Sequence, residues 1–401
     1  MSLTKALLLT SLLLISCLSG CMFFQKTSFT LLSFSIDNDN GFPRIVVQFN
    51  TSDTCEVTLT SPTQSILSSD TYYAGIQNES IYLSSYRTSV PPGTYQLKVV
   101  DTSKNTIYEK DLRFNGSLLS LQSLSVDTWD RKPVSSIFAL HLALQNSGDV
   151  PAYPYKFTVH HGVSVVDVLL PFTVILPSDS RLLTCFVDLS DSAVIEDQLN
   201  ISLYNNQGML LLQTIPTLLK SSYIGSWEYT WYYLSQRTLK IPKIEWLYDY
   251  YYSLDRFDII DYSAYVFDPY DDQYIDFLNQ QILALKDLQN DVETINFIAS
   301  FVQSIEYKND DPANESYEYP RFPLETLKEK RGDCEDKAIL TAALLESLGY
   351  NVSLIRLPQH MAVGVRLNQT IPGYSYYIDQ YYYLETTTLH MTLGRVPPEY
   401  Q

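Results

Sequence analysis

The chain has 401 residues, of which 45% are hydrophobic and 18% charged, so it can bury several cores and is not a disordered protein. Its formal net charge is −18, which argues against binding to nucleic acid or to anionic lipid head groups. The 5 cysteines, at positions 17, 21, 55, 185 and 334, have no zinc-site spacing, so we expect no metal, no cofactor and no disulfide scaffold.

The N-terminus has the pattern of an export signal. Lys5 precedes an apolar run that ends in the tetrad LSGC at residues 18–21. This tetrad resembles the lipobox of prokaryotic lipoproteins, which predicts a signal peptide over 1–20 and lipid attachment at Cys21. Because the apolar character continues to Phe24, an uncleaved N-terminal membrane anchor is the alternative. Both place the remaining chain outside the cytoplasm, on a prokaryotic cell surface. Sequons of a glycoprotein occur at Asn50, Asn78, Asn115, Asn200, Asn314, Asn351 and Asn368.

Residues 21–116 are predicted to form a first β-sandwich module of the Ig-like type. The runs RIVVQFN, CEVTLT, SIYLSS and TYQLKVVD are short, rich in β-branched and aromatic residues, and separated by turn residues. After a Pro-Pro-Gly turn, Tyr95, Leu97 and Val99 alternate onto one face of a strand.

Residues 117–221 repeat this pattern and predict a second β-sandwich module. Strands flank a turn at 146–149, and the stretch FTVILPSDSRLLTCFVDL (172–189) predicts a further pair of strands. His160 and His161 are neighbours in one strand, so their side chains point to opposite faces and do not suit a single metal ion.

The connector over 222–259 begins an aromatic-rich stretch that runs to residue 266. One interpretation is an interface that packs the second module against the next domain, because Tyr and Trp dominate such interfaces. The other is a platform on which sugar rings stack, which would make the protein a carbohydrate-binding surface protein.

From residue 276 the hydrophobic period becomes helical. Apolar side chains recur at spacings of three and four from Ile282 to Val302, which predicts one helix that runs through residue 304. The acidic stretch that follows, YKNDDPANESYEYP, matches no calcium-binding loop and predicts a solvated loop.

A second helix is predicted to begin at the stretch GDCEDKAILTAALLESLGY. Asp333 suits the N-cap, and Gly349 suits the C-terminal stop. Cys334 then lies at the positive end of the helix, which lowers the pKa of a thiol. At 100° per residue, we expect Glu335 and Asp336 to project away from Cys334.

Three predicted strands follow: NVSLIRL, HMAVGVRL and YYYLET. His360 opens the second strand and Glu385 closes the third, so the two side chains face each other if these strands are antiparallel neighbours. Cys334, His360 and Glu385 would then be nucleophile, base and orienting acid. Asp379 is a rival for the acid, and Gln359 is a candidate donor to an oxyanion beside the backbone N–H of Cys334.

These motifs resemble the transglutaminase-like superfamily, a branch of the papain-like cysteine hydrolases and acyltransferases. The resemblance covers 260–401 and is greatest to exported prokaryotic members with a Gly-Asp-Cys-Glu-Asp motif. It implies an α+β domain and a triad of Cys334, His360 and Glu385, although many members have Asp in an Asp-x-Thr setting where this chain has Glu385-Thr386.

The resemblance also implies an enzyme of the cell surface. It would form a thioester with an extracellular protein or peptide and act as a protease, amidase or acyltransferase. The alternative is a catalytically inactive surface scaffold whose β modules bind partners. No feature of the sequence predicts the oligomeric state.

Overall fold

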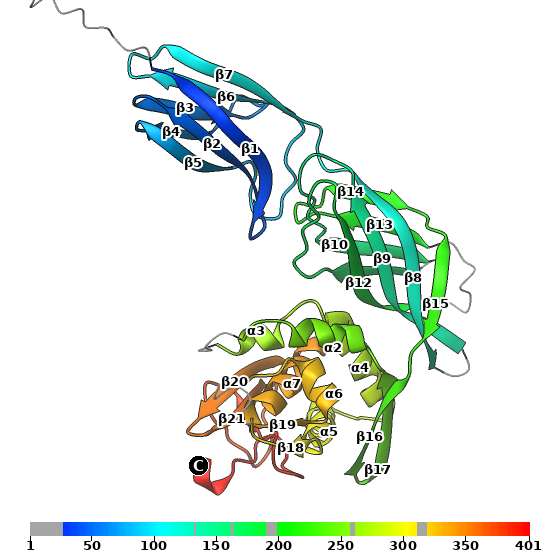
Figure 1. Cartoon of the computed structure of the whole chain (residues 1–401). Helices are drawn as coiled ribbons and strands as arrows, with labels where there is room; N and C mark the ends of the chain where they lie inside the picture. Colours follow the sequence, from blue (N-terminus) through cyan, green and yellow to red (C-terminus); the bar gives the residue numbers. More distant parts are fainter. Residues whose placement is uncertain (1–26, 132–133, 162–163, 190–198, 257–260, 311–318) are drawn as a thin grey trace, which may run out of the picture. The chain divides into compact units, whose positions relative to one another are not determined.

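The computed structural model describes residues 27–131, 134–161, 164–189, 199–256, 261–310 and 319–401 (Figure 1). The predicted signal, Cys21 and the sequon at Asn314 lie outside these residues. The chain divides into two compact units, residues 1–116 with 149–151 and residues 117–148 with 152–401. Among the described residues, no helix combines the length and apolar character that a bilayer crossing needs.

The first unit contains two antiparallel sheets, with strand orders β1-β2-β5 and β4-β3-β6-β7. The strands are β1 (Phe29–Asp39), β2 (Phe42–Thr51), β3 (Cys55–Thr60), β4 (Ile66–Tyr72), β5 (Gly75–Tyr82), β6 (Gly93–Asp101) and β7 (Thr106–Phe114). Both sheets contribute to one hydrophobic core. Tyr95, Leu97 and Val99 of β6 are fully buried, which confirms their predicted alternation. The predicted strand SIYLSS (80–85) is displaced along the chain, because β5 begins at Gly75 and ends at Tyr82.

The second unit begins with two further sheets, with orders β12-β9-β8-β15 and β11-β10-β13-β14. Their strands are β8 (Leu119–Arg131), β9 (Val134–Asn146), β10 (Lys156–His161), β11 (Ser164–Leu169), β12 (Ser180–Leu189), β13 (Asn200–Tyr204), β14 (Leu210–Thr214) and β15 (Leu218–Tyr223). The predicted pair of strands in 172–189 is wrong, since only β12 forms there. Pro171 and Pro177 lack the N–H that a strand needs, and the segment between them adds a single bridge at Ile175.

The aromatic stretch becomes a hairpin followed by short helices. β16 (Ser226–Tyr233) and β17 (Ser235–Pro242) pair antiparallel, and α2 (Glu245–Tyr252) and α3 (Ser263–Val266) follow. Trp227, Tyr229 and Trp231 are buried in a core that also contains Trp129 of β8 and Phe277 of the following helix. The aromatic side chains therefore join the β part of this unit to its helices, and the buried rings cannot stack on sugars.

The single helix predicted over 276–304 is wrong, because the chain forms two. α4 (Asp272–Leu283) ends before residue 284, and α5 (Asp291–Gln303) starts anew. The side chain of Asn290 accepts a hydrogen bond from the backbone N–H of Glu293 at 3.0 Å. This N-cap begins a second helix at a position where the hydrophobic spacing alone indicates continuity.

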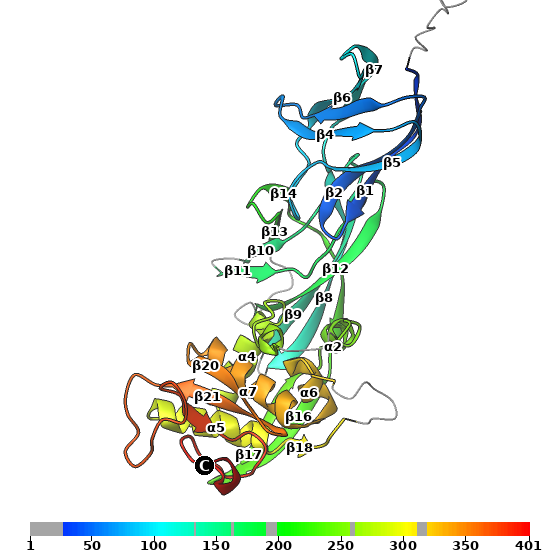
Figure 2. The same cartoon turned by 90° about the vertical axis from the view of Figure 1, so that its left-hand side faces the viewer.

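The C-terminal part places one helix against a small sheet (Figures 1 and 2). Its elements are β18 (Glu306–Tyr307), α6 (Pro323–Glu329), β19 (Arg331–Gly332), α7 (Cys334–Ser347), β20 (Asn351–Leu357), β21 (His360–Arg366), β22 (Tyr382–Leu384) and a 3₁₀ turn, η1 (Pro398–Tyr400). The sheet is antiparallel with order β20-β21-β22, and α7 packs against β20, β21 and the helices α4, α5 and α6. Because α7 is enclosed on several sides, its first residue has a fixed position.

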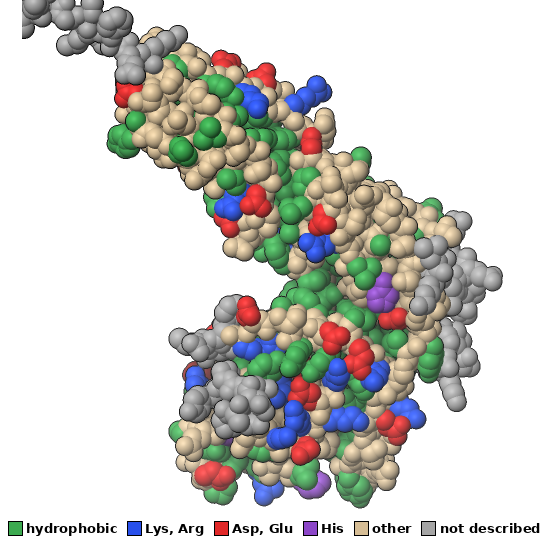
Figure 3. Space-filling view, in the orientation of Figure 1, with side chains coloured by type: hydrophobic (Ala, Val, Ile, Leu, Met, Phe, Trp, Pro, Cys, Tyr) green, Lys and Arg blue, Asp and Glu red, His purple; other side chains and the backbone are tan. Residues whose placement is uncertain are grey.

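Acidic and basic side chains are mixed over the helical part of this unit on the face that Figure 3 shows. Basic side chains therefore form no separate stripe on that face, as a nucleic-acid surface would require.

Candidate active site

Cys334 is the first residue of α7, and Asp333 is its N-cap with extended backbone. The thiol is free and half-buried. The first N–H groups of a helix have no carbonyl partner within it, so the backbone amides beside this thiol are suited to stabilise a developing negative charge. The predicted helix start and N-cap are therefore found in the structure.

His360 and Glu385 lie together, as the antiparallel arrangement predicts. β21 begins at His360, and Glu385 directly follows β22, which pairs with β21. His360 Nε2 lies 3.0 Å from Glu385 Oε2. A carboxylate only accepts hydrogen bonds, so Nε2–H is the donor and Nδ1 is the ring nitrogen that remains for the thiol. The rival Asp379 lies in an exposed turn.

Glu385 is held as a charged carboxylate. Its Oε1 accepts hydrogen bonds from the backbone N–H of Thr386 and of Thr387 at 3.1 and 2.9 Å, and from the Thr387 hydroxyl at 2.6 Å. Its Oε2 accepts from the Tyr383 hydroxyl at 2.7 Å in addition to His360. Burial by itself raises the pKa of Glu385, but these hydrogen bonds outweigh it and lower the pKa to about 2.

A cavity of about 480 Å³ opens between the start of α7 and the start of β21. Cys334 and His360 both line it, and so does Gln359, the candidate oxyanion donor. The backbone N–H of Met361, the residue after His360, interacts with the sulfur of Cys334, and this contact favours the thiolate. The nucleophile and base candidates therefore share one solvent-accessible space.

Glu335 lies against the thiol, which corrects the expectation that it projects away. The Cys334 S–H donates to Glu335 Oε2 at 3.2 Å. The spacing of 100° per residue on a helix fixes only the direction of each Cβ atom. The Glu335 side chain is long enough to turn back, so that its carboxylate reaches the thiol of Cys334. Burial, followed by the charge of Glu335, raises the pKa of Cys334 well above its ordinary value. In this arrangement the thiol is protonated.

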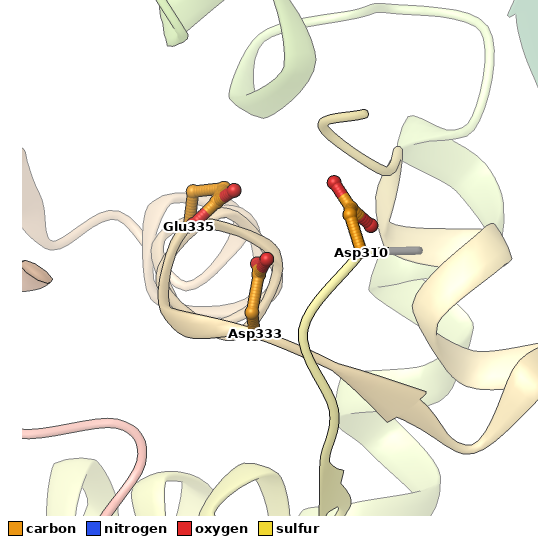
Figure 4. A group of neighbouring side chains, drawn as sticks. All are labelled: Asp310, Asp333 and Glu335. Atoms are coloured by element: carbon orange, nitrogen blue, oxygen red, sulfur yellow. The ribbon is translucent and has the colours of Figure 1, made fainter. Parts of the chain in front are cut away.

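Three carboxylates surround one side of the cavity (Figure 4). Asp333 and Glu335 come from the start of α7, and Asp310 comes from the segment after β18, with ligand oxygens all within 4.8 Å of one another. Carboxylate oxygens suit a hard cation, but Asp310 is already paired with the guanidinium of Arg321 at 2.7 Å. Burial and Glu335 raise the pKa of Asp333 to about 8, so at neutral pH a proton relieves the repulsion in this cluster.

Asp336 has a structural task that is separate from the thiol. It is fully buried and accepts from the Arg321 guanidinium at 2.7 Å and from the Arg321 backbone N–H at 2.8 Å. It also accepts from the backbone N–H of Asp333 at 3.3 Å. A Cβ on Gly332 would come within 2.7 Å of Asp336 Cβ, so this close approach requires glycine. Gly332 and Asp336 thus fix the turn that leads into Cys334.

Several residues that support the site were not predicted from the sequence. Gln303 of α5 donates to the backbone carbonyl of Glu385 at 2.8 Å. The ring of Tyr400 stacks on His360, with centroids 5.1 Å apart and an interplanar angle of 4°. The contact of Tyr383 with Glu385 could have been predicted from the sequence, because residues two apart in an extended strand lie on the same face. The contacts of Arg321 with Asp336 and of Tyr400 with His360 could not have been predicted in this way, because these residues are not local neighbours in the sequence.

Comparison with known proteins decides the class of this part of the chain. A family model described as a transglutaminase-like domain matches residues 275–391, which include all three triad candidates. Residues 275–391 are a transglutaminase-like domain. The sequence resemblance is thereby confirmed for this domain, and the other parts of the chain lie outside the match. No curated protein matches the chain.

Solved structures give weaker similarities. A candidate protease of Parabacteroides distasonis is 9% identical with a TM-score of 0.22, and the match covers 70% of this chain and 72% of that chain. A Porphyromonas gingivalis protein of unknown function is 14% identical with a TM-score of 0.17, and the match covers 46% of this chain and 95% of that chain. The exo-chitosanase CsxA of Amycolatopsis orientalis is 11% identical with a TM-score of 0.19, and the match spans 45% of this chain but only 26% of CsxA.

Proposed function

We propose that the transglutaminase-like domain is a cysteine hydrolase or acyltransferase that uses Cys334, His360 and Glu385. The observation that carries this proposal is the His360–Glu385 hydrogen bond of 3.0 Å at the edge of a cavity that also contains the Cys334 thiol. Glu385 orients the imidazole and stabilises its protonated form, which is the task of the third member of such a set.

The reaction begins with transfer of the thiol proton to Nδ1 of His360. The thiolate attacks the carbonyl carbon of an amide, and the C–N bond breaks as the imidazolium returns its proton to the leaving amine. The acyl group is then held as a thioester on Cys334. Water attacks this thioester with His360 as base, which releases a carboxylic acid and restores the thiol. An amine in place of water gives acyl transfer.

The helix start supplies electrostatic stabilisation for this reaction. In this mechanism the backbone N–H of Cys334 donates to the developing oxyanion, and one such donor contributes about 10²–10³ in rate. Gln359 lines the same cavity and is our candidate for the second donor. The substrate class that fits an extracytoplasmic enzyme of this family is a protein or peptide.

A second function, a catalytically silent binding scaffold, is favoured by the contact between Cys334 and Glu335. This hydrogen bond and the raised pKa of Cys334 oppose thiolate formation. The two functions differ in whether His360 governs the thiol, because only an enzyme needs the thiolate–imidazolium pair.

The discriminating experiment is alkylation of Cys334 by iodoacetamide between pH 5 and 9, followed by mass spectrometry. The matched variant is His360→Ala, and the buried thiols of Cys55 and Cys185 serve as internal references. The enzyme proposal expects Cys334 to react faster at neutral pH in the wild type than in the variant. Equal rates in both proteins would instead support the scaffold.

We further propose that the chain is held at a prokaryotic cell surface by a lipid on Cys21, with two Ig-like β modules between this anchor and the catalytic domain. The LSGC tetrad supports this arrangement. Cell fractionation after metabolic labelling with an alkynyl fatty acid tests it. Label on the wild type but not on Cys21→Ala is the expected result, and an unlabelled wild type would favour the uncleaved anchor.

A further inference from the structure

A second, smaller cavity of about 270 Å³ adjoins the catalytic cavity. We call it the annex. Six of the side chains that line it are apolar: Val266, Phe267, Ala342, Val352, Leu354 and Met361. They come from α3 and the residue after it, from α7, and from the strands β20 and β21, so the annex is built on regular elements on three sides.

The annex lies next to the cavity in which the chemistry is proposed to occur. Tyr262, Arg356 and Met361 line both cavities. Met361 directly follows His360, and its backbone N–H interacts with the Cys334 sulfur. A peptide carbonyl placed on Cys334 therefore has the annex within reach of a neighbouring side chain.

The chemistry of the annex favours an uncharged occupant. Ala342, Met361 and Val266 are almost fully buried, while Val352 and Leu354 are half-buried and present carbon atoms to the hollow. Apolar surface of this kind gains free energy when it leaves water. The charged residues that line the annex are Asp261 and Arg356, which have opposite signs. A charged side chain would lose its hydration there without a net field to attract it.

We propose that the annex is a specificity pocket for an aliphatic or aromatic side chain of the substrate, next to the residue that supplies the reacting carbonyl. This inference rests on the proposed function, since it takes the catalytic cavity as the place where the peptide lies. It names the substrate class more narrowly, as peptides with a Leu-, Met- or Phe-like residue beside the scissile bond.

The test measures binding without chemistry, so that its outcome is separate from that of the enzyme proposal. The full-length chain with Cys334→Ala is titrated by calorimetry with blocked alanine peptides in which one position in turn is Gly, Leu, Phe, Lys or Glu. We expect Leu or Phe to bind about 10-fold to 200-fold tighter than Gly at a single position, as for other hydrophobic pockets. Lys and Glu should give no such gain.

Two further variants assign this preference to the annex. Val352→Trp in the same background should fill the hollow and bring the ratio of Leu to Gly affinities close to one, and Leu354→Lys should do the same from the neighbouring strand position. Leu389→Trp, at an exposed position that lines neither cavity, should leave the ratio unchanged. Circular dichroism checks the fold of each variant.

The pocket is overturned if no position distinguishes Leu or Phe from Gly, which includes the case that no peptide binds. It is also overturned if folded Val352→Trp and Leu354→Lys proteins both keep the preference. If the peptides show this preference but Cys334 proves unreactive in the alkylation experiment, the pocket proposal stands and only the enzyme proposal is refuted.

Discussion

Glu335 lies against the Cys334 thiol, and its replacement by Gln tests how much its charge, in addition to burial, raises the pKa of that thiol. The Cys334 sulfur and Glu335 Oε2 are 3.2 Å apart. Two unit charges at that separation repel by about 5 kcal/mol with an effective dielectric constant near 20. Rotation of the Glu335 side chain in the thiolate state relieves part of this repulsion. We therefore expect Glu335→Gln to lower the pKa of Cys334 by about one to three units, the usual range for one neighbouring charge.

The assay is the rate of alkylation by iodoacetamide as a function of pH. Below the pKa of the thiol, its thiolate fraction rises tenfold for each unit by which the pKa falls. The intrinsic nucleophilicity falls at the same time, with a Brønsted coefficient of about 0.4–0.5. The two effects together predict a rate at pH 7 about 3-fold to 50-fold higher in Glu335→Gln than in the wild type.

Glu346→Gln is the matched control, because Glu346 is exposed and lies on the same helix, far from its first turn. It should leave the rate profile of Cys334 unchanged. The reasoning is refuted if the profile of Glu335→Gln coincides with that of the wild type or moves to higher pH. Either result would mean that burial, and not this carboxylate, keeps the thiol protonated.

Three other changes have defined outcomes. Glu385→Gln should lower the turnover of any substrate by about 10²–10⁴-fold, because His360 loses its charged partner. Because the pKa of Glu385 is lowered to about 2, the charged Glu385 stabilises the fold above pH 5, and this contribution is lost as the pH falls toward 2. The difference in unfolding free energy between the wild type and Glu385→Gln should therefore shrink toward zero between pH 5 and pH 2. Asp333→Asn keeps an N-cap residue but removes a carboxyl whose pKa is raised to about 8, so the folded state no longer has to hold this group as a buried charge at high pH. In denaturation experiments at several pH values, the variant's gain in unfolding free energy over the wild type should be absent near pH 4 and at least about 2 kcal/mol above pH 8. Tyr400→Ala should lower kcat and leave KM unchanged in steady-state kinetics, whereas Tyr400→Phe should retain the wild-type rate, because the stacked ring and not the hydroxyl holds His360.

The parts of the site that could be predicted from the sequence depend on local rules. Asp333 at the N-cap follows from capping preferences, and the meeting of His360 with Glu385 follows from their places at the ends of two antiparallel strands. The transglutaminase-like resemblance rests on the same residues and is confirmed by the family match over 275–391. These features need only short-range geometry.

The errors arise where a side chain reaches beyond its own position. The angular separation of residues on a helix placed Glu335 away from Cys334, but its three-bond side chain closes that gap. The apolar spacing over 276–304 hid the break at Asn290, because a single polar cap decides where α5 begins. Arg321, which neutralises both Asp310 and Asp336, is far from them in sequence and has no local signature.

The three carboxylates that flank Cys334 are not equivalent, and this explains how an acidic motif can surround a proposed nucleophile. Asp336 is buried against Arg321 and Gly332, where its hydrogen bonds support the turn, and burial raises its pKa to about 7. Asp333 caps the helix, and its raised pKa keeps it protonated at neutral pH. Glu335 is the acid that contacts the sulfur, and after burial its charge is the largest cause of the raised pKa of Cys334. In the proposed enzyme the thiol proton has two alternative acceptors, Glu335 Oε2 and Nδ1 of His360, and a ligand that draws Glu335 away would leave the imidazole as the acceptor.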